Sequence, residues 1–354
     1  MGEALAMTAG QELLDALGHE EVLLWRDRET GLRAIVAIHD TTLGPAVGGT
    51  RMRRYPSFDH ALVDALRLSR AMTAKAALAE MPYGGGKAVI LGDPACDKTD
   101  ALLEAYGRRL HTIEGRFHSG CDLGLTTRDV SFLSRFASNI SDAAGGSALD
   151  TAGLAALGVS AGIEAAAARL GRPMQGLRVT VQGVGAVGAQ LAHLLRRSGA
   201  RLTLADLDAA RVERLSGELD ADVVADPATA YDVDTDVFSP NAAGGVLNGD
   251  TVPRLRAKAV VGGANEQLQD PAHGDALHAR GILYAPDYVA NAGGLLSLLF
   301  ETGQCDEAGV AERVRAIGPR LAVLWERAAS EGLPPHRLAD RMVEERLAAA
   351  RARS

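Results

Sequence analysis

The 354-residue sequence has little of several features that would place it in other classes of protein. Its three cysteines, Cys96, Cys121 and Cys305, show no paired spacing, so we expect a reducing, cytoplasmic compartment. No apolar run reaches the roughly 18 residues of a membrane span, and the acidic N-terminal stretch has no signal-peptide core. The formal net charge of −8 argues against a nucleic-acid partner. We therefore expect neither a membrane nor a nucleic acid as partner.

Metal-binding patterns are also missing from the sequence. There is no HExxH motif, and His111, His118 and Cys121 do not have the spacing of zinc ligands, so we expect no metal site. Internal repeats and low-complexity tracts are absent too. With 354 residues and 47% hydrophobic content, the chain can bury a sizeable core, and we expect a soluble globular protein of two domains.

A glycine-rich stretch, MPYGGGKAVILGD over residues 81–93, is the first candidate site. Three glycines, Gly84–Gly86, run into Lys87, and the apolar run that follows is typical of a buried strand. We expect a glycine-lined hollow at the edge of this strand, where a lysine that has lost its water has a lowered pKa and can act as a base. Lys75, twelve residues upstream, would disfavour a charge on Lys87 further if it shares the hollow.

The same stretch has a simpler interpretation, a turn that carries a solvated lysine, and the stretch alone does not decide between the two. It is not a Walker A loop. Met81 and Ala88 stand where that motif needs a glycine and a serine or threonine.

Apolar periodicity predicts the elements around this stretch. We expect helices over residues 10–18, 58–79 and 99–114 and a β-hairpin over 21–40. The pair Gly48-Gly49 is a second point of close backbone approach, and Asp122 lies in a Gly/Ser-rich loop before a helix capped by Thr126 or Thr127. The small-residue stretch 140–153 predicts the domain boundary, and a helix over 154–170 follows, with Gly171 at its end.

The second half of the chain opens with a dinucleotide-binding pattern. A strand over 177–182 leads into Gly183, Gly185 and Gly188, then a helix to about Arg197 and a strand over 201–205 that ends at Asp206. The glycines allow the pyrophosphate to approach the helix N-terminus, so we expect the backbone of Ala186 and Val187 to contact it as well. A carboxylate at Asp206 binds the ribose hydroxyls of NAD and repels the 2′-phosphate of NADP, so NAD is the expected cofactor.

Further strands are predicted over 222–225, 235–238, 258–262 and 281–284. The loops after two of them carry Asn241 and Asn265, and ligands of such sheets bind at the carboxyl ends of the strands. Either asparagine has the alternative of a local Asx-turn.

The stretch 291–301 begins with Asn291, a further candidate for cofactor binding, and predicts one helix whose glycines approach the nicotinamide. The charged helices expected over 308–329 and 335–352 present either solvated surface or subunit contacts.

At this point the chain resembles the superfamily of glutamate, leucine, phenylalanine and valine dehydrogenases from about residue 20 to about 330. The motifs that carry the resemblance are GPAVGGTRM, MTAKAALAEMPYGGGKAVI, CDLG, VQGVGAVG, GGANEQL and ILYAPDYVANAGG, and several stretches look most like the phenylalanine dehydrogenase branch.

The resemblance implies an α/β fold of two domains with a cleft between them. Residues 1–150 would form a substrate-binding and oligomerisation domain, joined by the C-terminal helices 320–354, and residues 151–319 a Rossmann NAD-binding domain. A homo-oligomer, from dimer to octamer, is expected.

The activity implied by the resemblance is reversible oxidative deamination of an L-amino acid to a 2-oxo acid and ammonium. Lys75 would hold the substrate α-carboxylate, and Lys87 would be the general base that activates water. Asp122 would handle protons at the amino group, and Asn265 would fix the carboxylate and the nicotinamide. These roles agree with the chemistry of the residues, since a cation must neutralise the carboxylate and a base must take a proton.

Two positions indicate the kind of substrate. Glutamate-specific relatives carry a lysine and a serine where this chain has Val47 and Leu298, and a side-chain carboxylate there would be buried without a partner. An apolar amino acid is therefore expected, but aromatic and aliphatic side chains both remain open. The expected pocket residues are Val47, Gly48, Gly120, Leu295 and Leu298.

One departure from the resemblance is Ala155, where the family usually has threonine, and Thr151 lies one turn earlier. Two rival functions remain beside the amino-acid dehydrogenase. One is a catalytically silent NAD-binding homologue, and the other is an NADP-linked glutamate enzyme.

Overall fold

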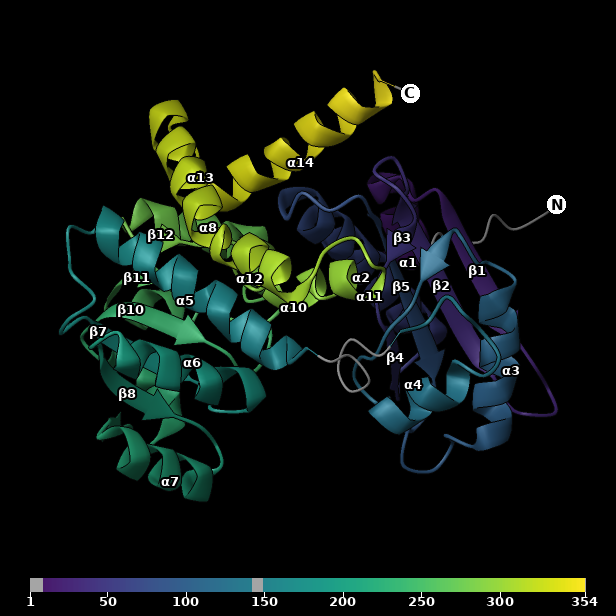
Figure 1. Ribbon diagram of the computed structural model, residues 1–354, viewed down its shortest axis with the longest axis horizontal. Coiled ribbons are helices and arrows are strands. Elements are labelled where there is room, and N and C mark those ends of the chain that lie inside the picture. Colours follow the sequence, from purple (N-terminus) through teal and green to yellow (C-terminus); the bar gives the residue numbers. More distant parts are fainter. Residues whose placement is uncertain (1–8, 142–148, 354) are drawn as a thin grey trace, which may run out of the picture. The chain divides into compact units, whose positions relative to one another are not determined.

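The computed structural model describes residues 9–141 and 149–353, and the chain forms two compact units (Figure 1). The first unit consists of Met1–Ala148 and Val343–Ser354, and the second of Leu149–Met342. Residues 142–148 of the expected linker 140–153 lie outside the described residues.

The first unit is built on one mixed sheet with the strand order β1-β2-β5-β3-β6, in which β4 pairs with β5. Its strands are β1 (Glu21–Arg26), β2 (Arg33–Asp40), β3 (Ala46–Val47), β4 (Thr50–Arg53), β5 (Gly84–Leu91) and β6 (Phe117–His118). Its helices are α1 (Ala9–Leu17), α2 (Phe58–Leu78), α3 (Asp100–His111) and α4 (Thr127–Leu133). One core lies between the sheet and helices α1 and α2, and a larger one lies between the sheet and helices α3 and α4.

The strand predicted after Lys87 begins earlier, at Gly84, so the glycine-rich stretch is not the turn of the simpler interpretation. Gly84–Gly86 are the first three residues of β5, a central and completely buried strand. Side chains there would meet neighbouring atoms, since a Cβ at Gly85 would lie 2.0 Å from the backbone nitrogen of Thr73 in α2, and one at Gly86 would lie 2.7 Å from the ring of Phe117. The glycines therefore let helix and sheet approach closely.

The second unit is built on a parallel sheet with the order β12-β11-β10-β7-β8-β9. Its strands are β7 (Arg178–Gln182), β8 (Arg201–Ala205), β9 (Asp222–Val223), β10 (Thr235–Pro240), β11 (Ala257–Val260) and β12 (Leu283–Tyr284). When β7 is counted as strand 1 and the sheet is read from β9, the strand order is 3-2-1-4-5-6. This is the order of a dinucleotide-binding Rossmann domain, as predicted. The point where the strand order reverses lies between β7 and β10.

The helices of the second unit begin with α5 (Thr151–Arg169), α6 (Ala186–Arg197), α7 (Ala209–Leu219) and α8 (Pro271–Ala279). The helix predicted over 291–301 is instead a series of single turns, α10 (Gly293–Leu296) and α11 (Leu298–Glu301), after α9 (Asp287–Ala290). The helix predicted over 308–329 is divided into α12 (Glu307–Arg315) and α13 (Ile317–Glu331), because Pro319 has no N–H to donate to the carbonyl of Arg315.

The C-terminal helices are divided between the units, contrary to the prediction that residues 320–354 join the first. Helix α13 stays with the second unit, where Trp325 is buried and its Nε1 donates to the carbonyl of Tyr284 over 2.8 Å. Helix α14 (Pro335–Arg351) begins in the second unit and ends in the first, where Arg351 pairs with the buried carboxylate of Asp40.

Helix α5 is long and apolar enough to cross a membrane by length and composition alone. Half of its apolar window is buried inside the protein, however, and it packs against α6 and α13 within the second unit. Such packing is typical of the core helix of a folded domain.

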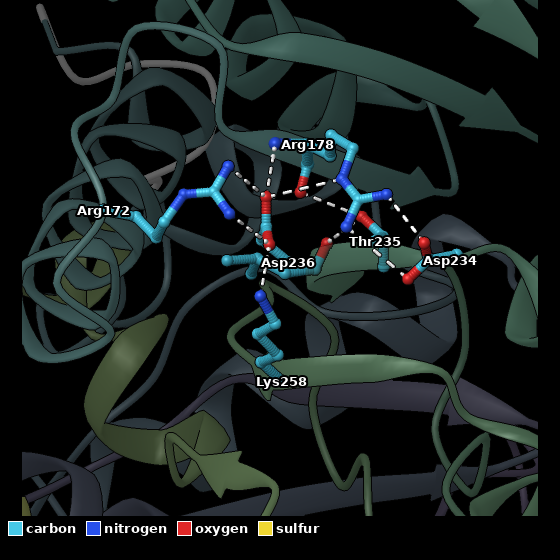
Figure 2. Close-up of polar contacts among 7 residues, drawn as sticks. Arg172, Arg178, Asp234, Thr235, Asp236 and Lys258 are labelled. Atoms are coloured by element: carbon cyan, nitrogen blue, oxygen red, sulfur yellow. Dashed lines mark hydrogen bonds and ion pairs between the residues drawn. The ribbon is translucent and has the colours of Figure 1, made fainter.

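A buried carboxylate joins the amino ends of three strands in the same unit (Figure 2). Asp236 of β10 accepts from the backbone N–H of Arg178 at 3.1 Å and from Lys258 Nζ of β11 at 3.1 Å, and it pairs with Arg172 at 3.3 Å. These ends lie at the edge of the sheet opposite to the one where dinucleotides bind.

Candidate functional site

Lys87 lies in β5 and is 6% exposed. The prediction that Lys87 lies at the edge of the strand is wrong, because β5 begins at Gly84 and Lys87 lies inside it. This strand pairs with β2 on one side and with β3 and β4 on the other. Side chains alternate along a strand, so Lys87 shares a face with Gly85 and Val89, the face that α2 covers. Its ammonium donates a hydrogen bond to Oδ2 of Asp122 and forms an ion pair with it. The structure therefore brings the two predicted catalytic residues together.

Lys75 lies in the last turn of α2, two residues beyond Thr73. Because Thr73 packs directly on Gly85, this part of the helix runs beside the part of β5 that carries Lys87. The close approach that the glycines allow thus places both predicted lysines in the same region of the first unit.

The strand β4 and the two glycines before it support the loop that carries Asp122. The backbone N–H groups of Thr50 and Met52 donate to the carbonyls of Gly120 and Leu123, both at 2.8 Å. A Cβ at Gly49 would lie 2.9 Å from the Cβ of Asp122, so only glycine leaves room for the aspartate. The loop is therefore fixed on both sides of Asp122.

Gly48 has a similar steric reason to be glycine, since a Cβ there would lie 1.8 Å from the carbonyl oxygen of Gly86. The prediction of a close backbone approach at Gly48-Gly49 is confirmed.

Burial, two positive charges and hydrogen bonds determine the protonation of Asp122. Burial alone would raise its pKa, but the Lys87 ammonium and the Arg51 guanidinium, with hydrogen bonds from Lys87 and the backbone of Leu123, lower that pKa to about 2. Asp122 is therefore a carboxylate at neutral pH. Arg51 was missed as a site residue because its motif served only to identify the family, and nothing local in the sequence links it to a residue 71 positions away.

The predicted pocket residues of the first unit lie close to this pair. Val47 of β3 is 5% exposed and pairs in register with Gly85 and with His118 of β6. Gly120 follows β6, and a Cβ there would lie 3.3 Å from the carbonyl of Ser141. His118 shares a hydrogen bond of 2.8 Å with the hydroxyl of Ser141, and burial lowers its pKa. A neutral imidazole therefore lies beside Val47.

The glycine turn after β7 has the geometry of a dinucleotide site. Gly183 has φ of +87°, and a Cβ at Gly188 would lie 1.9 Å from its carbonyl, so the turn and the close packing of α6 both require glycine. A Cβ at Gly185 would meet no atom of the described residues within 4 Å. Gly185 is the N-cap of α6 and has no side chain that could accept hydrogen bonds from the N–H groups of Ala186 and Val187. These features fit a bound pyrophosphate.

Asp206 follows β8 and is held by the turn itself. Its Oδ2 accepts from the backbone N–H of Val184 at 2.7 Å, and its Oδ1 accepts from the N–H of Asp208 at 3.0 Å. Arg211 of α7 lies 3.9 Å from Asp206 and 3.1 Å from Asp208. The carboxylate is thus fixed beside the glycine turn, as binding of ribose hydroxyls requires.

The three predicted asparagines lie at the carboxyl edge of the same sheet. Asn241 donates to the carbonyl of Ser239 and accepts from the N–H of Gly263 at 2.9 Å, so it links the ends of β10 and β11. Asn291 donates to the side-chain oxygen of Asn265 at 2.8 Å. The Oδ1 of Asn291 is buried and accepts no hydrogen bond within the described part of the chain, so it has capacity for a donor.

The glycines of the 291–301 stretch pack on α5, which differs from the predicted approach to a cofactor. A Cβ at Gly293 would lie 2.1 Å from the carbonyl of Leu154, and one at Gly294 would lie 3.3 Å from the carbonyl of Thr151 and 3.9 Å from the Cβ of Ala155. Thr151 and Ala155 therefore both border Gly294.

The two predicted pocket leucines follow these glycines. Leu295 is half-buried in α10, and Leu298 is buried at the start of α11. Over residues 9–141 and 149–353, no group of three or more His, Cys, Asp or Glu side chains is arranged to hold a metal ion.

The fold and these two groups of residues define a dinucleotide-dependent oxidoreductase, and comparison with known proteins places it more closely. Residues 19–139 match the dimerisation domain of the Glu/Leu/Phe/Val dehydrogenases, and residues 204–317 match the second domain of the Glutamate/Leucine/Phenylalanine/Valine dehydrogenases. The chain belongs to this family and is an amino-acid dehydrogenase, as the sequence resemblance predicted.

Relatives match it over nearly the full length. Leucine dehydrogenase of Geobacillus stearothermophilus is 41% identical over 94% of this chain and 92% of its own. Phenylalanine dehydrogenase of Thermoactinomyces intermedius is 42% identical over 95% and 93%. The crystal structure of L-tryptophan dehydrogenase from Nostoc punctiforme superposes with a TM-score of 0.84 at 39% identity, covering 96% of this chain and 99% of the other.

Proposed function

We propose that this protein catalyses the NAD-dependent, reversible oxidative deamination of an apolar L-amino acid to a 2-oxo acid and ammonium. The observation that carries the proposal is the buried pair of Lys87 and Asp122, in a chain that also contains a dinucleotide-binding domain. Burying a lysine beside an ionised aspartate costs desolvation free energy, and such pairs are common in catalytic sites.

The roles of the residues follow from their chemistry. Lys75 binds the α-carboxylate of the substrate. Lys87, in its neutral form, takes the proton from the water molecule that attacks the imino carbon. Asp122 exchanges protons with the substrate nitrogen, and its low pKa makes it an anion that attracts an ammonium group. The nicotinamide, when bound, accepts the hydride from the α-carbon.

NAD rather than NADP is the proposed cofactor. Gly185, Ala186 and Val187 would hold the pyrophosphate, and Asn241, Asn265 and Asn291 would lie toward the nicotinamide end. Asp206 would accept hydrogen bonds from the ribose hydroxyls, and its carboxylate would repel a 2′-phosphate. The support for this choice is the position of Asp206, fixed by the N–H of Val184 in the glycine turn.

The proposed substrate has an apolar side chain, because Val47 and Leu298 are both buried and carry no polar atom in their side chains. Leucine, phenylalanine and tryptophan are the substrates in the names of the relatives, and they differ widely in size. A glutamate side chain against either residue would lose its hydration without gaining a partner.

The test is an absorbance assay for NADH and NADPH formation with the purified protein. It would pair each cofactor with Leu, Val, Phe, Trp and Glu. We expect turnover with NAD and at least one apolar amino acid, and little with glutamate or NADP. NAD binding without turnover on any amino acid would favour a silent homologue, and preference for NADP and glutamate would replace the proposed specificity.

We further propose that residues 1–150 form the substrate-binding and oligomerisation part of a cytoplasmic homo-oligomer. The match of residues 19–139 to a dimerisation domain supports this assignment. Light scattering coupled to size-exclusion chromatography would give the number of subunits, and a monomer at micromolar concentration would contradict it.

A further inference from the structure

Arg51 occupies a position in the first unit that the function proposed above does not use. It lies in β4, between Thr50 and Met52, whose N–H groups fix the loop of Asp122. Its side chain is 15% exposed and contacts two carboxylates. A largely buried cation with such partners is either a structural link or part of the site's electrostatics.

The two contacts of Arg51 differ in kind. Its Nη1 donates to Asp64 of α2 at 3.1 and 3.3 Å, and Asp64 also accepts from the hydroxyl of Tyr55 at 2.6 Å. Its Nε lies 3.6 Å from Oδ1 of Asp122, which is an ion pair but too long for a hydrogen bond. Asp64 therefore holds the guanidinium group, and Asp122 receives its charge without losing an acceptor site to it.

The two oxygens of Asp122 thus have different surroundings. Oδ2 accepts from the Lys87 ammonium, whereas Oδ1 faces Arg51 and accepts from the backbone N–H of Leu123. A guanidinium free to turn would bind both oxygens of a carboxylate in the fork geometry that arginine prefers, and would compete with Lys87. The contact with Asp64 prevents this.

We propose that Arg51, held in place by Asp64, is a positioning residue that directs Oδ2 of Asp122 toward Lys87 and sets the pH range in which this pair works. The proposal rests on the function proposed above for Lys87 and Asp122. Among the described residues, Lys87 of β5 and Arg51 of β4 are charged groups that face Asp122, and Asp64 of α2 acts through Arg51.

Opposite changes of charge at two positions test the proposal. Arg51→Met removes a positive charge next to the pair, so we expect the acidic limb of the profile of kcat/KM against pH to move to higher pH by about one unit. Asp64→Asn removes a negative charge, so the same limb should move to lower pH. Arg51→Met should also lower kcat about 10- to 100-fold, with a change in amino-acid KM of less than about threefold. Arg51→Lys should restore most of the position of the limb.

The matched control is Arg53→Met, the same substitution two residues further along β4. Arg53 is exposed and lies over the ring of Tyr55, 5.1 Å from its centroid, so we expect neither kcat nor the pH profile to change. Limbs that stay in place in Arg51→Met and Asp64→Asn, or that move in the same direction, would overturn the proposal and leave Arg51 a structural residue.

A second measurement does not depend on turnover. Carbon-13 NMR of the aspartate carboxyl carbons, with Asp122 assigned by loss of its signal in Asp122→Asn, gives the pKa of Asp122 directly. We expect a higher pKa in Arg51→Met than in the wild type, and an unchanged pKa would reject the proposal. Should the wild type turn over no amino acid, the proposed function fails, whereas the NMR result still decides the role of Arg51.

Discussion

Asp122 in the first unit and Asp236 in the second are both aspartates that positive charges hold ionised, and the pKa of each is lowered although burial opposes this. They differ in whether the cations that surround the aspartate are exposed or buried. The side chain of Asp236 is inaccessible, and its partners Arg172, Arg178 and Lys258 are 39%, 40% and 52% exposed (Figure 2). At the other pair, the Lys87 side chain is 7% exposed and Asp122 19%.

Location separates the two aspartates as well. Asp236 lies near the amino end of β10, five residues before Asn241, a separation of about 16 Å along an extended strand. Asp122 lies in a loop, 19% exposed and supported by β4. Similar electrostatics thus occur at a structural position and at the proposed catalytic position, and a lowered pKa alone does not distinguish the two.

The largest expected effect comes from removing the buried cation of the first pair. Lys87→Ala should reduce kcat by about 10²- to 10⁴-fold, because it removes the proposed general base. NAD affinity, measured by quenching of protein fluorescence, should be largely unchanged. Lys75→Ala is the matched lysine variant and should act mainly by raising the KM of the amino acid, since it removes carboxylate binding. Normal turnover by Lys87→Ala would refute its role as the base.

The same substitution at the two aspartates gives the next effect. Asp122→Asn should lower kcat by about 10²-fold or more, because an amide takes up no proton. Asp236→Asn should leave kcat within about twofold when corrected for the folded fraction, since no step of the proposed mechanism involves it. Steady-state rates at saturating substrate would show the contrast, and equal losses in both variants would mean that the two aspartates do not differ in their role in catalysis.

Asp236 should matter for the stability of the protein, although we expect it not to matter for turnover. Asp236→Asn should reduce the free energy of unfolding by about 1–3 kcal/mol, because the N–H of Arg178 and the neighbouring cations lose a charged acceptor. The loss stays below that of a fully buried pair, since the cations are partly exposed and can be hydrated instead. Urea unfolding followed by circular dichroism measures it. A variant as stable as the wild type would mean that the cluster contributes nothing.

The smallest expected effect is the change with pH of the difference in unfolding free energy between wild type and Asp236→Asn. The pKa of Asp236 is lower in the folded protein than its usual value, so the stability it contributes is present above about pH 4 and is lost as the pH falls through the folded pKa. The difference between wild type and Asp236→Asn should therefore shrink on acidification. Urea titrations between neutral pH and about pH 3 would test this. If the difference in unfolding free energy grew on acidification, the pKa of Asp236 would be raised in the folded protein and not lowered.

The dinucleotide-binding domain was the part of the fold most readily predicted from sequence. Strand, glycine turn, helix, strand and Asp206 follow one another within about thirty residues, so local pattern contains nearly all the information. Gly84–Gly86 were predicted to precede a strand, because only the packing of Thr73 on Gly85 shows that they belong to it. The predicted helix over 308–329 is divided just before Pro319, for a local reason that apolar periodicity does not reveal.

The candidate site shows the same limit. Lys75, Lys87 and Asp122 were found by motif, whereas Arg51 depends on a contact between β4 and a distant loop, which no local spacing indicates. The glycines of 291–301 were expected to face a ligand, but the carbonyl of Leu154 in α5 occupies the space. Residues whose purpose is to fit a neighbouring element cannot be told from ligand-binding ones until that neighbour is known.

The path of α14 has a consequence for how the protein is made. The first unit begins before the second in the sequence, but its last residues, Val343–Ser354, follow the second unit and are synthesised after it. Until Arg351 leaves the ribosome, the carboxylate of Asp40, buried to 4% exposure, lacks the guanidinium that pairs with it. The unit that contains Lys87 and Asp122 therefore begins to emerge before the dinucleotide-binding unit and is complete only after it, whereas the dinucleotide-binding unit is a continuous segment that can finish folding earlier.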